Sequence, residues 1–187
     1  MPRSTAHRQG VHHLVVRVLA FNREGEYLVQ RRAEKKESCP GFYTDSASGH
    51  VSFSLGLLFQ PEVVLLGESS RELEEEVGLS PVGGEEGELI RPFSVPKYSP
   101  EAFETSHCFV AAVEGEVVTS EEVDPARTGF VGRDRLVEML GSGKFVPVAR
   151  EYWWELLREV GEGNPWDVIF GPRDPSAPSP SPPAAHR

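Results

Sequence analysis

The alternation of apolar and polar residues divides the first part of the chain into short β-strands. Leu14 to Phe21 is an apolar, β-branched run, Asn22 to Gly25 has the composition of a turn, and Tyr27 to Arg31 continues as a second strand. This order of strand, turn and strand predicts a β-hairpin. The remaining predicted strands are short and are bounded by polar or glycine-containing segments: Tyr43–Ser48, Glu88–Val95, His107–Val113 and, as an extension, Glu116–Thr119.

Two helices are predicted from apolar residues that recur on one face. Arg133 to Leu140 forms the shorter helix, and Pro147 to Val160 forms the longer one, which Gly161 ends. The apolar face of the longer helix follows the spacing i, i+3, i+4, i+7: Trp153, Leu156, Leu157 and Val160. Strands with interspersed helices indicate a mixed α/β fold.

A third helix carries a dense block of acidic residues before Gly78. Glu72, Glu75 and Glu76 share one face at the spacing i, i+3, i+4, and Glu68 points the same way one turn earlier. Like charges at this spacing destabilise a bare helix, so a divalent cation bound between them is one explanation for the block. The alternative is a solvated acidic face, which is the commoner role of such a run.

The string Arg71 to Leu79, RELEEEVGL, resembles the second half of the Nudix box, whose pattern is Arg-Glu-aliphatic-any-Glu-Glu-any-Gly-aliphatic. Every fixed position of that pattern is met. The segment Gln30 to His50 is similar to the sequence that precedes the box in the isopentenyl-diphosphate-isomerase-like branch of the superfamily. The resemblance covers Val11 to Val160 and implies a Nudix-type α/β/α sandwich with a mixed β-sheet.

The first half of the box departs from the Nudix pattern in its spacing. Counted from Gly49, the arginine of the box is expected at position 63 but stands at position 71, so the chain has eight extra residues here. We expect an insertion in the loop, with Ser69 or Ser70 as the N-cap of the acidic helix. The alternative is a helix that begins at Pro61, which places Gly67 inside it at a cost of about 1 kcal/mol relative to alanine. The extra segment is apolar, which predicts that it packs on the domain or forms a homodimer contact.

The resemblance implies a metal-dependent enzyme whose ligands lie on the acidic helix. Glu72, Glu75 and Glu76 are the implied ligands of Mg²⁺ or Mn²⁺, and the carbonyl of Gly49 is a further ligand. Arg71 is expected to orient a glutamate of the helix. Carboxylate oxygens suit these hard cations, which keep several waters and bridge to substrate phosphates.

Residues outside the box supply further candidates. The general base is open between a helix glutamate and two residues of a later loop, Glu101 and Glu104. His50 directly follows the glycine ligand and is a candidate for touching metal or substrate, whereas His12 and His13 are expected to have structural or solvent roles. Four basic residues either hold a diphosphate or form an exposed loop end: Arg31, Arg32, Lys35 and Lys36.

Composition places the chain among ordinary soluble globular proteins. Hydrophobic residues make up 39% and charged residues 26% of its 187 residues, which suits one domain with tails. The net charge of −10 argues against non-specific binding to a nucleic-acid backbone, and no apolar run approaches the ~20 residues of a membrane span. The chain begins without the apolar core of a signal peptide and has two cysteines, so we expect a reducing, cytoplasmic location.

Three regions are expected along the chain. Residues 1–10 are a flexible N-terminus, residues 11–170 form the Nudix domain, and residues 171–187 are a disordered Pro-rich tail. The tail cannot bury enough apolar surface to offset its ordering entropy. A chain that ends at Phe170 is therefore expected to fold and turn over substrate like the full chain.

Hydrolysis of a diphosphate linkage in a nucleoside-diphosphate-X type or related small molecule is the predicted function. The alternative enzyme is an isopentenyl-diphosphate isomerase, whose pattern has a cysteine where Ser48 stands. That pattern also has two glutamates, and the corresponding positions hold Glu104 and Ser106, so the isomerase is disfavoured. A third hypothesis is a non-catalytic, ligand-sensing Nudix module, which the altered spacing of the box favours and the intact ligand set opposes.

Overall fold

The computed structural model describes residues 11–84, 87–100 and 102–172. The expected flexible N-terminus and almost all of the expected Pro-rich tail lie outside these residues. Within the described residues, no helix is long and apolar enough to cross a membrane.

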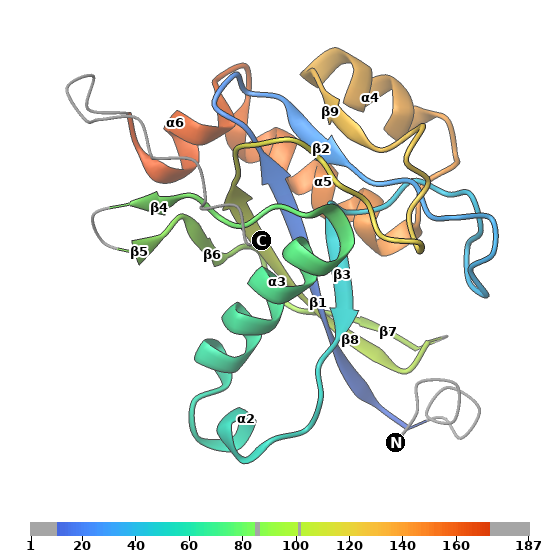
Figure 1. Ribbon diagram of the computed structural model, residues 1–187, viewed down its shortest axis with the longest axis vertical. Coiled ribbons are helices and arrows are strands. Elements are labelled where there is room, and N and C mark those ends of the chain that lie inside the picture. Colours follow the sequence, from blue (N-terminus) through green and yellow to red (C-terminus); the bar gives the residue numbers. More distant parts are fainter. Residues whose placement is uncertain (1–10, 85–86, 101, 173–187) are drawn as a thin grey trace, which may run out of the picture.

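A mixed seven-stranded sheet forms the centre of the described structure (Figure 1). β1 lies at its middle, parallel to β8 and antiparallel to both β2 and β3. The main strand order is β6-β8-β1-β2-β9, with β3 paired to β1 and β7 paired to β8. The strands are β1 (His13–Phe21), β2 (Tyr27–Val29), β3 (Ala47–His50), β6 (Ile90–Pro92), β7 (Lys97–Ser99), β8 (Glu104–Ala112) and β9 (Gly129–Val131). A separate small hairpin pairs β4 (Gly83–Gly84) with β5 (Gly87–Glu88).

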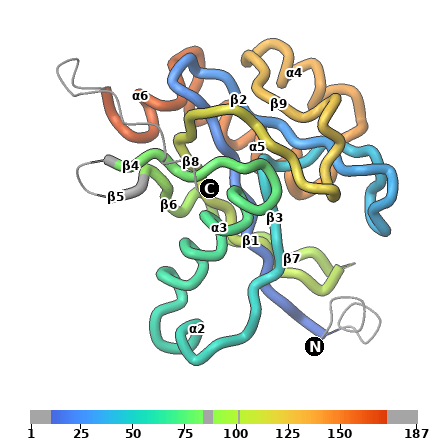
Figure 2. The backbone as a smooth tube through the Cα atoms, in the orientation of Figure 1, coloured from blue at the N-terminus to red at the C-terminus, as the bar shows by residue number. Residues whose placement is uncertain are grey.

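Helices cover both faces of the sheet. α3 lies in front of β1 and β3 in Figure 1, and α5 lies behind the sheet, an arrangement that the backbone tube of Figure 2 also shows. The helices are α2 (Leu55–Phe59), α3 (Pro61–Val77), α4 (Arg133–Gly141), α5 (Pro147–Val160) and α6 (Pro165–Phe170). This is the predicted α/β/α sandwich.

The alternation of side chains along β1 explains the two layers. Val16 and Val18 pack in one core with residues of α3, whereas Leu19 and Phe21 pack in the other core with residues of α5. Because both faces of β1 are covered, the strand reads as a continuous apolar run rather than an alternating one. The hairpin turn is also confirmed, with Gly25 in a left-handed conformation at φ 82°.

The bounds of α5 and the end of α3 agree with the prediction, whereas the start of α3 differs. α5 has the predicted bounds, and α3 ends as predicted, with Gly78 in the left-handed conformation at φ 70°. The expected N-cap at Ser69 or Ser70 is wrong, because α3 already begins at Pro61 and both serines lie inside it. The Ser69 hydroxyl donates to the carbonyl of Leu65 within the helix. The extra residues therefore form helical turns rather than an inserted loop alone.

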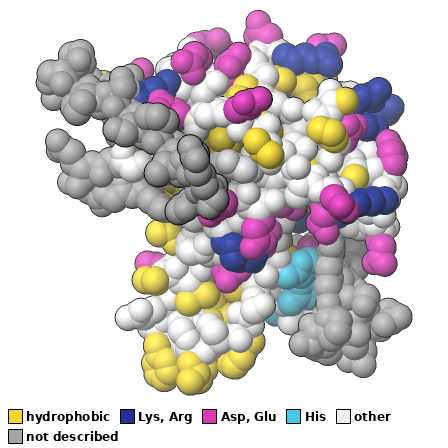
Figure 3. Space-filling view, in the orientation of Figure 1, with side chains coloured by type: hydrophobic (Ala, Val, Ile, Leu, Met, Phe, Trp, Pro, Cys, Tyr) yellow, Lys and Arg dark blue, Asp and Glu magenta, His cyan; other side chains and the backbone are white. Residues whose placement is uncertain are grey.

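The apolar segment before and within the start of α3 packs on the sheet only in part. Leu65 is buried, and Leu57 and Leu66 pack against the α3-side core. Five large apolar side chains stay exposed and gather over α2 at the lower tip of the molecule in Figure 3: Phe53, Leu55, Leu58, Phe59 and Val63. The expected packing on the domain is thus seen for part of the segment, and the alternative of a homodimer contact through the exposed part stays a prediction.

Two of the predicted strands also differ from the structure. The strand expected over Tyr43–Ser48 is β3 at Ala47–His50, because Tyr43 makes only isolated bridges to Arg31 and Phe145. Residues 116–119 form no strand, and the Val118 amide instead donates to the Val77 carbonyl at the end of α3. α6 was not anticipated, although Asn164 caps it by accepting from the Trp166 amide.

Candidate metal and catalytic site

The contact between α3 and β3 places Glu72 against Gly49. A Cβ atom built on Gly49 would lie 1.9 Å from Oε1 of Glu72, so only glycine allows the carboxylate to come this close to the strand. Gly49 is held in the sheet by pairing with Val16 of β1. Burial between the helix and the strand raises the pKa of Glu72.

Arg71 holds three carboxylates of α3 around one guanidinium group. It donates to Glu68 at 2.6 Å, to Glu72 at 2.5 Å and to Glu75 at 2.6 Å. These hydrogen bonds, that with Glu68 first, raise the pKa of Arg71. The acidic face is therefore an array of carboxylate oxygens arranged around a positive charge.

Glu76 points from α3 toward the sheet and is held there by two donors. Its Oε2 atom accepts from Nε2 of Gln30 at 2.9 Å and from the Ser48 amide at 3.0 Å. Burial raises the pKa of Glu76 to about 7, because the loss of solvent outweighs these two hydrogen bonds. The sequence did not reveal Gln30 or Ser48 as partners, since each lies on another element.

The donor set of α3 suits a hard divalent cation, although it is not drawn into one cluster. Glu72 and Glu76 both face β3, whereas the Glu75 side chain is 58% exposed and bound to Arg71. Within the described part of the chain, these three carboxylates do not converge on a common point. Oxygen ligands next to a backbone carbonyl are the set that Mg²⁺ and Mn²⁺ prefer, so the residues fit such an ion.

His13, His50 and Glu104 converge on the opposite, α5 side of the sheet. Their ligand atoms lie within 4.8 Å of one another, with Nε2 of His13 and Nε2 of His50 at 3.3 Å and 3.4 Å from Oε1 of Glu104. The Val11 carbonyl accepts from Nδ1 of His13, which leaves Nε2 as the nitrogen that faces the carboxylate. Imidazole and carboxylate together could hold a transition metal ion.

This role of His13 was not predicted, because its partner Glu104 stands 91 residues away in the sequence. Parallel pairing of β1 with β8 sets His13 opposite Glu104, and β3 adds His50 beside them. His12 points elsewhere and contacts the Thr105 hydroxyl. Glu101, the other candidate base, lies outside the described residues.

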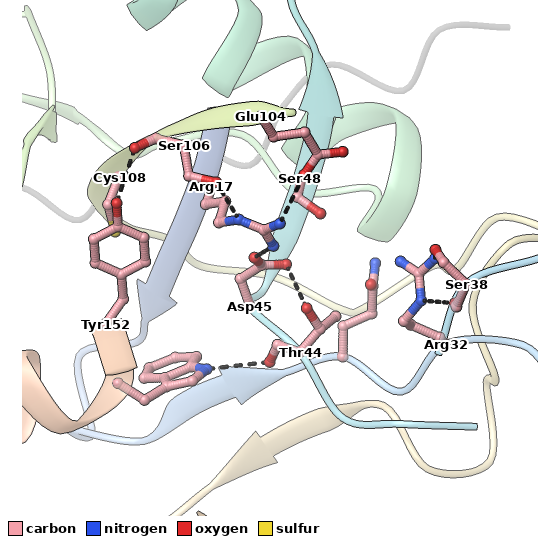
Figure 4. A network of polar contacts seen from close by, with 12 residues as sticks. Arg17, Arg32, Ser38, Thr44, Asp45, Ser48, Glu104, Ser106, Cys108 and Tyr152 are labelled. Carbon is pink, nitrogen blue, oxygen red and sulfur yellow. Dashed lines mark hydrogen bonds and ion pairs between the residues drawn. The ribbon is translucent and has the colours of Figure 1, made fainter. Parts of the chain in front are cut away.

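A buried polar network lies beneath Glu104, as Figure 4 shows. Arg17 donates to Asp45 at 2.6 Å and to the Ser106 hydroxyl at 3.0 Å, and its Nη2 atom lies 3.9 Å from Glu104. Although burial opposes it, hydrogen bonding from His50 and the charge of Arg17 lower the pKa of Glu104 to about 2. Glu104 is therefore an ionised carboxylate in a largely buried position.

The four candidate basic residues do not form one cradle. Arg31 contacts Asp124 and Glu34, while Lys35 and Lys36 pair with acidic residues at positions 121 and 122. Arg32 donates to the carbonyl and the hydroxyl of Ser38. Among the described residues, Arg32 has no acidic partner.

The sandwich with an acidic helix packed on a glycine of the sheet has the fold of the Nudix proteins. A solved structure of a MutT protein from Methanosarcina mazei Go1 shares this fold with a TM-score of 0.59 at 23% identity, covering 81% of this chain and 96% of that one. No protein-family profile matches the chain.

Sequence relatives agree with this class. The chain is 30% identical over 141 residues to an uncharacterized Nudix hydrolase of Listeria innocua, covering 72% of each sequence. It is 25% identical over 177 residues to human isopentenyl-diphosphate delta-isomerase 2, covering 81% of this chain and 74% of the relative. The chain belongs to the Nudix hydrolase family, whose members act on diphosphate-containing substrates.

Proposed function

We propose that the chain hydrolyses a diphosphate linkage in a nucleoside-diphosphate-X type or related small molecule and depends on Mg²⁺ or Mn²⁺. The observation that carries the proposal is the contact between Glu72 and Gly49. This contact sets a carboxylate of the acidic helix next to the backbone of β3. A side chain at position 49 would prevent the contact, because its Cβ atom would overlap the Glu72 carboxylate.

Each residue of this site has a proposed role. Glu72, Glu75, Glu76 and the Gly49 carbonyl hold the ion, and Arg71 orients the carboxylates that it contacts. A bound ion supplies charge neutralisation for the diphosphate and lowers the pKa of a coordinated water. Phosphoryl substitution then needs mainly positioning and charge stabilisation from the protein.

The general base and the phosphate contacts come from outside the metal ligands. Glu104 is a candidate base because it is ionised, although it lies beside His50 on the α5 side of the sheet and the carboxylates of α3 lie on the other side. Arg32 is the proposed diphosphate contact, since it is the basic residue of its segment without an acidic partner in the described structure. Arg31, Lys35 and Lys36 stay predicted contacts of the diphosphate, although each forms an ion pair with an acidic neighbour in the structure.

A diphosphate substrate panel with Mg²⁺ and Mn²⁺ provides the test. On a substrate found in this way, Glu75→Gln and Glu76→Gln are each expected to lower kcat by a factor on the order of 10² or more, because each removes charge next to the reacting phosphates. Glu74→Gln is the matched control: it lies on the same helix, is exposed, and should change kcat by less than about twofold.

Two further readouts separate chemistry from folding. Without metal, the melting temperature of Glu75→Gln and Glu76→Gln should stay level or rise, since repulsion between carboxylates falls. Titration with Mn²⁺ should show weaker binding in both. Turnover within a few-fold of the parent in both variants would refute the metal site. Ligand binding without turnover of any diphosphate would favour the non-catalytic module.

Isomerisation of isopentenyl diphosphate is the second candidate, favoured by the convergence of His13, His50 and Glu104. Moving a double bond requires proton transfer at carbon, and these are the acid–base groups gathered on the α5 side. Ser48 and Ser106 stand against it, since the isomerase pattern has a thiol and a carboxylate there. Incubation with isopentenyl diphosphate in D₂O separates the two reactions, because an isomerase incorporates deuterium and a hydrolase releases phosphate.

A further inference from the structure

Two adjoining cavities lie at the β2–β9 edge of the sheet, against α4. One has a volume of about 320 Å³ and the other of about 520 Å³. Tyr43, Arg127, Arg135 and Met139 line both, so the cavities are two lobes of one groove. Lobes of this size lie within the range of small-molecule sites.

The smaller lobe is basic in a chain whose net charge is −10. Arg31, Arg127, Arg135 and Lys144 line it, with Glu138 as its acidic residue. Arg135 forms an ion pair with Glu138, with 2.5 Å between Nη1 and Oε2. Arg31 forms ion pairs with Glu34 and Asp124.

Two cations of the basic lobe are available to a ligand. No carboxylate among the described residues lies within ion-pair distance of Arg127 or Lys144. Guanidinium groups present two parallel N–H donors, which match the oxygens of a phosphoryl group. The lobe therefore offers charge and geometry for a phosphate.

The larger lobe is mostly apolar. Val29, Phe130 and Val131 line it beside Met139, and Gly129 leaves one wall open. A Cβ atom built on Gly129 would meet no heavy atom within 4 Å. An apolar or aromatic body fits this lobe while an attached phosphate reaches the basic one.

The groove is separate from the acidic helix. None of its lining residues is a proposed metal ligand. Val29, Val131 and Met139 belong to the α5-side core, whereas α3 packs on the other face of the sheet, and α4 lies far from α2 in Figure 1. Arg31 belongs to this groove, whereas Arg32 points away to Ser38.

We propose that this groove binds an organic phosphate, with the phosphoryl group on Arg127 and Lys144 and the aromatic or aliphatic body between Val131 and Met139. This binding site lies beyond the proposed diphosphate hydrolysis and requires no metal ion.

Binding of adenosine 5′-monophosphate to the full chain in excess EDTA tests the proposal, because hydrolysis is then absent. Calorimetry at low salt should give one site. Ribose 5-phosphate, which lacks the adenine base, and adenosine, which lacks the phosphate, should each bind at least about fivefold more weakly. A higher salt concentration should weaken the binding of the two phosphate-containing ligands and leave the binding of adenosine unchanged.

Variants locate the site. The double variant Arg127→Gln, Lys144→Gln should raise the Kd for adenosine 5′-monophosphate at least about tenfold. Arg150→Gln is the matched control, since this exposed arginine of α5 lies outside the groove, and its Kd should stay within about twofold of the parent. Gly129→Leu should fill the apolar lobe and remove the preference for the nucleotide over ribose 5-phosphate. Melting temperatures within about 2 °C of the parent confirm that the variants fold.

Amide chemical shifts on titration give an independent location. The largest changes are expected at residues 127–131 and 139–144. The absence of saturable binding, equal binding by the double variant, or shift changes confined to β3 and α3 would each overturn the proposal.

Discussion

Gly49 joins the strand and the helix of the candidate site, because the Glu72 carboxylate occupies the space where any side chain would begin. Gly49→Ala is expected to displace Glu72 and to lower the free energy of unfolding by about 1–3 kcal/mol, the usual cost of overpacking. Mn²⁺ affinity should fall in the same variant. Urea unfolding and a Mn²⁺ titration measure the two effects.

Gly67 provides the opposite case on the same helix. It lies in the middle of α3, and a Cβ atom there would meet no heavy atom within 4 Å. Gly67→Ala should therefore raise the free energy of unfolding by about 1 kcal/mol and leave Mn²⁺ affinity unchanged. If Gly49→Ala behaves like Gly67→Ala, the close approach of Glu72 to β3 is not required for the site.

Glu155 gives a pH dependence that is independent of the metal residues. Burial opposes it, but hydrogen bonds from Lys97, at 2.7 Å, and from Ser94 lower the pKa of Glu155. A carboxylate with a lowered folded pKa stabilises the protein above its unfolded pKa, near 4.5, and this contribution is lost as the pH falls through the folded value. Glu155→Gln should thus cost about 0.5–1 kcal/mol at pH 7.

The difference between Glu155→Gln and the parent should narrow as the pH falls below about 4.5. Denaturant unfolding at several pH values measures it. Glu159→Gln is the control, since this residue of α5 is exposed and should show no such trend. If the difference in free energy of unfolding between Glu155→Gln and the parent stays constant down to low pH, the hydrogen bonds of Glu155 with Lys97 and Ser94 do not lower its pKa.

Single residues of the site were predictable where their chemistry is local. The glutamate spacing and Gly78 are visible in one short string, and the structure places Glu72 and Glu76 toward β3 as a ligand face requires. The partnership of His13 with Glu104 was not predictable, because a parallel pairing across 91 residues leaves no local pattern. Whether the helix residues bind metal stays a prediction.

Among the elements, the region from α2 to α3 differs most from the prediction. The spacing of the Nudix box suggested an inserted loop, and the serines at 69 and 70 looked like a cap. Pro61 suits a first helical turn, and packing of Leu65 on the sheet extends the helix through Gly67 despite its low propensity. Tertiary contacts thus decided the boundary, which the local signals placed nine or ten residues too late.

The exposed and buried apolar residues of this region should respond differently to substitution. Phe59 is 80% exposed, so Phe59→Ser should leave the free energy of unfolding within about 0.5 kcal/mol of the parent. Leu65 is 6% exposed, so Leu65→Ala should cost about 2–4 kcal/mol through a cavity under α3. Chemical denaturation compares the two. A large loss from Phe59→Ser would show that the side chain is covered in solution, and sedimentation would then show whether a second copy covers it.

At the scale of the whole molecule, one strand organises both layers. β1 is covered by α3 on one face and by α5 on the other, and it places the carboxylate face and the His13–His50–Glu104 group on opposite sides of β3. The mixed α/β class followed from the strand and helix patterns. The order of the strands did not, because it depends on which apolar faces meet after the chain has collapsed.

The end of the folded domain gives the last prediction. α6 closes the α5-side core with Trp166 and Ile169, which are 6% and 4% exposed, and Asn164 ties it to the β1–β2 turn by donating to the Arg23 carbonyl. Gly171 donates to the Asp167 carbonyl at the helix end, so a chain that stops after Pro172 keeps the contacts that α6 makes within the described residues. Its melting temperature and turnover should match those of the full chain. A chain that stops after Gly163 removes the indole and the isoleucine from the core and should lose about 3–5 kcal/mol or more. A marked loss in the Pro172 chain would show that residues 173–187 contribute to the fold, whereas an unaffected Gly163 chain would show that α6 is not part of the core.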